Sequence, residues 1–276
     1  MKLYKTKSGI VIERNGKFYH LGEQNWNSFL NDDHLHDKME KLASSMKPSA
    51  YAEVLVERDL LAPIQDQEVW GSGITYISTM ENRRDEGETS GDFYAKLYHA
   101  ERPELYLKAT PGRTVGSKDL INIRKDSTWD FAEPELTAFA TSSGKIVGYT
   151  VGNDVCSRSI EGENPIYLPQ SKIYERCASI GPGILVTETP LPKDTIIHIL
   201  ISRSGKSVFD EKVGINKMKR EPQDLINWLF KECAFPHGVF LLTGTGITPG
   251  KDFTLKSADK VEITIDHIGT LINYVN

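Results

Sequence analysis

The pattern of apolar positions predicts many short strands and few helices. Two apolar runs, 10–13 and 18–21, flank the pair Asn15-Gly16, which favours a tight hairpin turn. In the last third, runs of strand length lie at 183–187, 195–201, 207–210, 239–242 and 260–267. Residues 222–233 have helical spacing instead, with Leu225, Trp228 and Leu229 on one face. This pattern is typical of a β-rich α+β fold.

The chain divides into two unequal parts. Residues 26–50 are polar, with a predicted helix at 37–45, and the composition changes around residues 60–63. A length of 276 residues can hold a large and a small domain. We therefore predict a small N-terminal domain at 1–63 and a larger domain at 64–276.

The stretch Asp130–Asp154 carries the strongest chemical signal in the chain. Glu133 and Glu135 are two residues apart, so in a strand their carboxylates point to the same face. A predicted hairpin then returns the chain to Asp154, 154 − 135 = 19 residues later. Carboxylates that converge repel one another unless a cation lies among them, and all-oxygen ligation suits Mg²⁺, Mn²⁺ or Ca²⁺ rather than zinc. Pattern alone favours a different interpretation, in which the two glutamates are solvated acids on an edge strand.

Other charged residues lie where they could serve the same site. Glu104, Tyr106 and Lys108 share one face if their segment is a strand, either as a simple ion pair or as a base and an anion clamp. Lys172 follows Asp154 by 172 − 154 = 18 residues. A lysine among three carboxylates would neutralise charge, although composition alone favours a surface lysine.

Two further segments have weaker signals. Gly71–Tyr76 is rich in glycine, which lets backbone approach a ligand closely, but it lacks the lysine of a phosphate-binding loop. His34 and His36 could bind a metal in principle. No third ligand lies near them in the sequence, so we interpret them as exposed loop residues.

Composition narrows the class of protein. The net charge of −5 gives no basic field for nucleic acid. The start MKLYKTKSG lacks the apolar core of a signal peptide, and no apolar run approaches a membrane span. The three cysteines form no CxxC pair. We therefore predict a cytoplasmic protein that binds neither nucleic acid nor membrane.

Several strings in the same order resemble the fumarylacetoacetate hydrolase family. They are E-x-E at 133–135, followed by GYTVGNDVCSR, YLPQSK, LLTGTGI and a terminal GTL-I-N. The likeness covers roughly Val69 to the C-terminus. The strings WGSGITY, ERPELYLKATP and IEGENPIYLPQSKIYERCASIGP are most similar to the 2-keto-3-deoxy-D-arabinonate dehydratase branch. The resemblance implies the family's β-roll catalytic domain after a small N-terminal domain. It also implies an oligomer, either a homodimer or a homotetramer.

The resemblance also implies roles for individual residues. Glu133, Glu135 and Asp154 would ligate Mg²⁺, with Mn²⁺ or Ca²⁺ as alternatives, and Lys172 would lie near the metal and the substrate carboxylate. Glu104 is the candidate acid/base. The candidate substrate contacts are Thr75, Tyr76, Lys108, Arg158, Gln170 and Thr245. The chain departs from the family at Ser159, where relatives often have an aspartate in S-x-R-D, and this change removes an expected partner of Arg158.

The expected substrate is a small 2-oxoacid, which can chelate the ion and be deprotonated at C3 to an enolate. Loss of a C4 hydroxyl then gives dehydration, and attack of water on a C4 ketone gives C–C hydrolysis. The branch resemblance favours dehydration of a 2-keto-3-deoxy-D-arabinonate-like sugar acid to 2,5-dioxopentanoate. The first alternative is a C–C hydrolase of acylpyruvate or fumarylacetoacetate-type 1,3-diketo acids. Its family members use a His–Glu dyad on a lid, whereas His99 is the only histidine between Thr75 and Glu104. The third reading is a catalytically silent protein that binds a metal and a 2-oxoacid.

Overall fold

The computed structural model describes residues 1–84 and 95–276, and strands dominate it. The strands are β1 (Lys2–Thr6), β2 (Gly9–Arg14), β3 (Lys17–Gly22), β4 (Glu68–Gly73), β5 (Glu104–Ala109), β6 (Thr114–Val115), β7 (Leu120–Ile121), β8 (Asp130–Ala140), β9 (Ile146–Ser157), β10 (Ala178–Val186), β11 (Ile196–Arg203), β12 (Lys206–Gly214), β13 (Val239–Leu242), β14 (Lys260–Ile265) and β15 (Gly269–Val275). The helices are α1 (Trp26–Leu30), α2 (Leu35–Ser45), α3 (Ala50–Arg58), α4 (Ile77–Arg84), α6 (Arg158–Glu163), α7 (Leu168–Lys172) and α8 (Pro222–Leu229). The predicted β-rich α+β class is confirmed.

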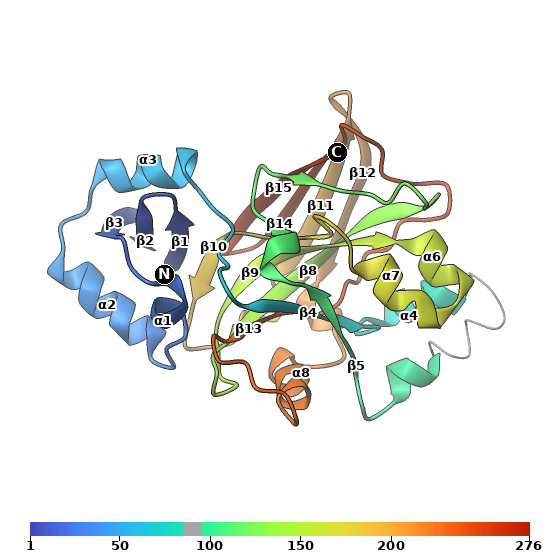
Figure 1. Cartoon of the computed structure of the whole chain (residues 1–276), viewed down its shortest axis with the longest axis horizontal. Helices are drawn as coiled ribbons and strands as arrows, with labels where there is room; N and C mark the ends of the chain where they lie inside the picture. The colour runs from blue at the N-terminus through green and yellow to red at the C-terminus, as the bar shows by residue number, and fades with distance from the viewer. Residues whose placement is uncertain (85–94) are drawn as a thin grey trace.

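A ten-stranded sheet runs through most of the molecule in the order β3-β2-β1-β10-β9-β8-β13-β4-β5, with β6 paired to β10 (Figure 1). Because β1 pairs with β10, the first three strands extend the same sheet that contains β8 and β9. One apolar cluster correspondingly joins Leu3 and Ile12 to Ile180 and Ile184. The predicted domain boundary at residue 63 stays a prediction. Strands from both sides of this boundary belong to the same sheet.

A second sheet, in the order β12-β11-β14-β15-β7, packs against the middle of the first one. The contact is apolar and involves one face of β8 and β9. Ala132, Leu136 and Ala138 of β8 lie in one cluster with Ile199 of β11 and Ile263 of β14. Side chains alternate along a strand, so Glu133 and Glu135 point to the opposite face of the ten-stranded sheet. The core between the sheets therefore fixes which side of β8 carries the acids.

The local predictions from the sequence are largely confirmed. Asn15 and Gly16 have φ values of 52° and 70°, as a tight hairpin turn between β2 and β3 requires. The predicted helix at 222–233 forms α8, but α8 ends at Leu229, so its apolar face is Leu225, Ile226 and Leu229. The pattern did not predict β1, α3 or β15.

Among the described residues, no helix is both long enough and apolar enough to span a membrane.

Candidate active site

The three predicted acids meet on one face of the β8–β9 hairpin. Glu133 stands directly opposite Asp154, and Glu135 stands opposite Gly152, in the antiparallel register. Their carboxylate oxygens lie within 4.8 Å of one another, and all three side chains are buried. Burial removes these three carboxylates from water, which is unfavourable for charged groups. Neighbouring cations and hydrogen-bond donors must therefore replace the lost hydration.

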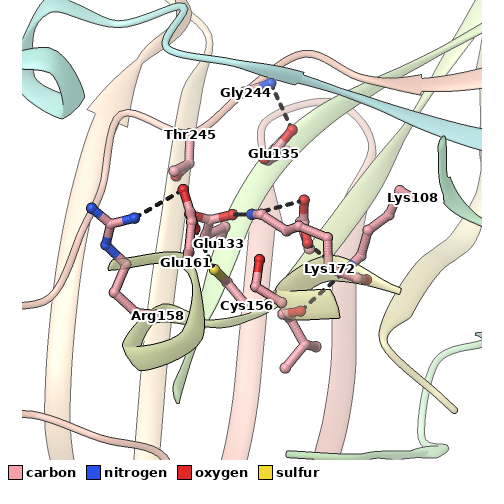
Figure 2. Close-up of polar contacts among 12 residues, drawn as sticks. Lys108, Glu133, Glu135, Cys156, Arg158, Glu161, Lys172, Gly244 and Thr245 are labelled. Carbon is pink, nitrogen blue, oxygen red and sulfur yellow. Dashed lines mark hydrogen bonds and ion pairs between the residues drawn. The ribbon is translucent and has the colours of Figure 1, made fainter. Parts of the chain in front are cut away.

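Two buried lysines, which Figure 2 shows, and a tyrosine supply part of that compensation. The ammonium of Lys172, at the end of α7, donates to Glu133 and lies 3.1 Å from Asp154 Oδ2. Lys108 Nζ, from β5, lies 2.6 Å from Asp154 Oδ1. Tyr106 Oη, also from β5, donates to Asp154 Oδ2 at 2.8 Å. Asp154 is thus held from three sides.

Glu135 is held differently, by backbone. The N–H of Gly244 donates to Glu135 Oε2 at 2.6 Å, from the loop that follows β13. Gly244 has φ of +90°, and a Cβ there would lie 2.1 Å from Thr75 Oγ1. The loop after β13 therefore needs glycine at this position in order to point its amide at the acid.

The shifts in the pKa values of the buried groups show which carboxylate has no cation beside it. Burial, together with the charges of Asp154 and Glu133, raises the pKa of Glu135 well above its usual value. Burial also opposes ionisation of Asp154, but Lys108 and Lys172 outweigh it and hold that pKa below its usual value. Burial disfavours the charged amine of Lys172, yet Asp154 and its other anionic neighbours raise its pKa well above normal. The site therefore has excess negative charge, centred on Glu135.

These residues fit a hard divalent cation. Three carboxylates and two ammonium groups give a formal charge of 2 − 3 = −1, so a bound cation would balance the charge that raises the pKa of Glu135. All candidate ligand atoms are carboxylate oxygens, which Mg²⁺ prefers. When bound, such an ion would act as a Lewis acid that polarises an oxygen of the substrate.

A small cavity opens beside the acids. Glu133, Glu135 and Lys172 reach it, and its remaining polar wall consists of Ser72, Thr79, Glu104, Tyr106, Glu161 and Thr245. These residues come from β4, α4, β5, α6 and the loop after β13, so segments far apart in the sequence build one wall.

The glycine-rich segment at 71–76 has a role that the sequence did not predict. Gly71 pairs with Tyr106 and Gly73 with Glu104 across β4 and β5. A Cβ at Gly71 would lie 2.6 Å from the Tyr106 ring, and one at Gly73 would lie 1.8 Å from Glu104 Oε2. These glycines make room for two cavity-wall side chains, and not directly for a ligand.

The candidate acid/base Glu104 and three of the predicted substrate contacts lie at or beside the cavity. Glu104 and Thr245 line it. Thr75 is buried and donates to the Thr243 carbonyl at 2.7 Å, so it supports the loop that carries Thr245. Tyr76 is fully buried near Glu135, and its hydroxyl has no hydrogen-bond partner among the described residues.

Lys108 and Gln170, two predicted substrate contacts, are not among the residues that line the cavity. The ammonium of Lys108 has three donors, and its partners are the carbonyls of Val155 (2.9 Å) and Lys172 (2.6 Å) and the Asp154 carboxylate. Two of the donors are thus used by backbone carbonyls, and the ion pair with Asp154 indicates a supporting role for this lysine. Gln170 is exposed, because it lies two residues before Lys172 on α7 and so points to the other side of the helix.

Arg158 has a partner that replaces the acid absent at Ser159. Its Nη1 lies 2.8 Å from Glu161 Oε1, one helical turn further along α6. The Cys156 thiol donates to the other oxygen of Glu161 at 3.1 Å (Figure 2). The sequence analysis did not identify Glu161 as a site residue. The available signal was the spacing of three residues from Arg158, which places an ion pair on one helix face.

His99 does not supply the histidine of a lid dyad. It is exposed and packs its ring edge-on against Tyr98, with the ring centres 5.2 Å apart. It is not among the residues that line the cavity.

Relatives and solved structures of known kind are similar to this chain. It is 46% identical over 220 residues to the 2-dehydro-3-deoxy-D-arabinonate dehydratase of Saccharolobus solfataricus, covering 77% of this chain and 73% of that protein. It is 41% identical over 240 residues to the probable 2-keto-3-deoxyxylonate dehydratase of Haloferax volcanii, covering 86% and 82%. A structure of 2-keto-3-deoxy-D-arabinonate dehydratase complexed with magnesium and 2,5-dioxopentanoate matches with a TM-score of 0.85 and 36% identity, over 100% of this chain and 99% of that one.

The family model described as fumarylacetoacetate (FAA) hydrolase C-terminal matches residues 134–276. The resemblance and the fold predicted from the sequence are thereby confirmed. This match covers more than half of the chain, and the dehydratases are over 30% identical across most of it. The chain therefore belongs to the fumarylacetoacetate hydrolase family.

Proposed function

We propose that this chain is a Mg²⁺-dependent dehydratase that converts a 2-keto-3-deoxy pentonate of the D-arabinonate type to 2,5-dioxopentanoate. The observation that carries the proposal is the buried cluster of Glu133, Glu135 and Asp154 beside Lys172, in a chain that matches a magnesium- and 2,5-dioxopentanoate-bound dehydratase along its whole length. Mg²⁺ would be held by the three carboxylates.

Dehydration requires removal of a C3 proton, stabilisation of the enolate and departure of the C4 hydroxyl, which takes up a proton and leaves as water. The 3,4-alkene so formed becomes 2,5-dioxopentanoate when a proton moves from C5 to C3 and the resulting C4–C5 enol ketonises. Lys172 lies at the cavity with its ammonium among the acids, so it can hold the charge that develops on the substrate oxygens. Glu104, on β5, lines the same cavity and is the proposed base for the C3 proton. Thr245 and Tyr76 are the proposed neutral contacts to the substrate.

A second wall carboxylate, Glu161, distinguishes this cavity from an apolar one. The guanidinium of Arg158 lies 2.8 Å from Glu161 Oε1 and forms an ion pair with this carboxylate. An ionised carboxylate accepts hydrogen bonds from hydroxyl groups, which a sugar acid has and an acylpyruvate lacks at C4. This wall supports a polyhydroxy substrate over a 1,3-diketo acid.

The proposal is tested by incubating the purified protein with 2-keto-3-deoxy-D-arabinonate and with an acylpyruvate, in Mg²⁺ or in EDTA, and analysing products by NMR and mass spectrometry. We expect a five-carbon aldehyde acid from the sugar acid only, with activity lost in EDTA. Two shorter acids from the acylpyruvate, with no turnover of the sugar acid, would replace the dehydratase by a C–C hydrolase. Binding of Mg²⁺ and 2-oxoacid without turnover would support the silent binding protein.

We further propose that the enzyme works in the cytoplasm as a homodimer or homotetramer. The family resemblance supports the assembly, and the three cysteines without a disulfide support a reducing compartment. Light scattering at micromolar concentration tests the assembly, because a monomer mass there would contradict it.

A further inference from the structure

A second group of metal-ligating side chains lies away from the active site, where α2 meets the end of β10. His36 and Asp37 belong to the first turn of α2, and Glu188 follows β10 by two residues. They are 188 − 36 = 152 positions apart in the sequence. The β1–β10 pairing brings the N-terminal part of the chain to the end of β10. The third ligand that the sequence lacks near His36 is thus supplied by the fold.

The spacing of the atoms is that of ligands around one ion. The ligand atoms of His36, Asp37 and Glu188 lie within 4.8 Å of one another. His36 Nδ1 and Glu188 Oε2 are 3.5 Å apart. Two ligands at bond lengths of about 2.1 Å and a tetrahedral angle are separated by about 3.4 Å. Nδ1 is shielded from solvent and makes no hydrogen bond within the described part of the chain, so its lone pair is available.

The surroundings favour a cation. The three ligands line one cavity together with Asp33, His34 and Lys145. Three carboxylates face one lysine there, which gives a formal charge of 1 − 3 = −2 with neutral histidines. Two of the charged groups are already engaged. Lys145 Nζ donates to the Asp33 carbonyl at 2.7 Å, and the Asp33 carboxylate accepts from Thr141 and Ser143. Asp37 and Glu188 remain for the ion, and both are exposed to its entry.

We propose that His36, Asp37 and Glu188 form a binding site for a divalent transition metal of the Zn²⁺, Co²⁺ or Ni²⁺ type. An imidazole nitrogen with two carboxylates selects these ions over Mg²⁺, which prefers the all-oxygen set of the active site. Three protein ligands leave the fourth position to water or to His34, which lines the same cavity. The bound ion would tie α2 to the segment after β10 and so stabilise the N-terminal part on the sheet.

The test uses Co²⁺ as the probe, because its visible absorption reports nitrogen and oxygen ligation directly. The whole protein, with Glu135→Gln to weaken the active site and with millimolar Mg²⁺ present, is titrated with CoCl₂. We expect one saturable absorption change per chain at micromolar Co²⁺, and displacement by Zn²⁺. His36→Ala and Glu188→Gln, each in that background, should weaken binding at least tenfold.

The matched control is His198→Ala. His198 also faces an acid, with Nε2 2.8 Å from Asp210 Oδ1, but it belongs to no three-ligand group within residues 1–84 and 95–276. It should bind Co²⁺ as the parent does. Thermal unfolding gives a second readout, in which Zn²⁺ should raise the melting temperature of the parent and of His198→Ala, but not of Glu188→Gln. An absent absorption change, or one unaltered by His36→Ala, would overturn the proposal.

Discussion

Lys108→Met tests whether this buried lysine supports the acids, as the structure places it, or contacts the substrate. The change removes the ammonium while keeping a side chain of similar length. It takes away the 2.6 Å partner of Asp154 and the donor to the carbonyls of Val155 and Lys172. Breaking a buried ion pair from one side costs about 3–5 kcal/mol, and each carbonyl left unsatisfied costs about 1–3 kcal/mol.

These costs do not add in full, because Asp154 keeps Lys172 at 3.1 Å and Tyr106 at 2.8 Å. We therefore expect the free energy of unfolding to fall by about 3–5 kcal/mol, taking the buried ion pair as the dominant contribution. Domains of this kind have about 5–15 kcal/mol in total, so the variant should still fold. The loss should shrink in saturating Mg²⁺, because the ion would supply positive charge to Asp154.

Urea unfolding with and without Mg²⁺ measures these differences. Lys193→Met is the control, since that lysine is 85% exposed and its removal should leave the midpoint unchanged. If Lys108→Met kept nearly full stability while the KM for the sugar acid rose tenfold or more, the supporting role would be wrong and a substrate contact would be restored.

Four further predictions address the metal and the chemistry. Glu135→Gln should fold but bind Mg²⁺ far more weakly, measured by calorimetry; unchanged affinity would remove Glu135 from the ligand set. Lys172→Met should lower kcat by roughly 10²–10³ while Mg²⁺ binding survives; equal losses of both would make the lysine a metal-site scaffold only. Glu104→Gln should suppress exchange of the substrate C3 protons in D₂O, followed by NMR, whereas normal exchange would assign the base elsewhere. Mg²⁺ binding should release protons from Glu135. The pKa of this carboxyl is raised in the metal-free folded protein, so it stays protonated to a higher pH there than in the unfolded chain. The metal-free protein should accordingly lose stability as pH rises from the unfolded pKa through the raised one, and calorimetry in buffers of different ionisation enthalpy should detect the released protons; no buffer dependence would contradict it.

The acids were predictable from the sequence because they lie on one hairpin. Glu133 and Asp154 are joined by a single turn, and period-two alternation decides the face that they share. Lys172 required the family resemblance, since its approach to Glu133 depends on the short helix α7. The helical spacing of α7 also explains why Gln170 is exposed although Lys172 is buried. The two residues share a sequence motif, but they lie on different faces of the helix.

The supporting residues were harder to predict because their partners are distant in the sequence. Lys108 lies on the predicted face of β5, yet its three partners lie on β9 and α7, and neither of these elements pairs with β5 in the sheet. The roles of Gly71 and Gly73 likewise depend on the register between β4 and β5. The residue types indicated which chemistry the site could perform. The contacts that each residue makes depend instead on the pairing of segments far apart in the sequence.

The pairing of β1 with β10 has a practical consequence for anyone who wishes to trim this enzyme. A shortened gene that starts at residue 64 would uncover the outer edge of β10 and the apolar side chains that Leu3 and Ile12 cover. An exposed strand edge with free N–H and C=O groups recruits strands from other chains. A minimal version for immobilisation or fusion would therefore precipitate unless the N-terminal strands were supplied, either in the same chain or as a separate peptide that pairs with β10.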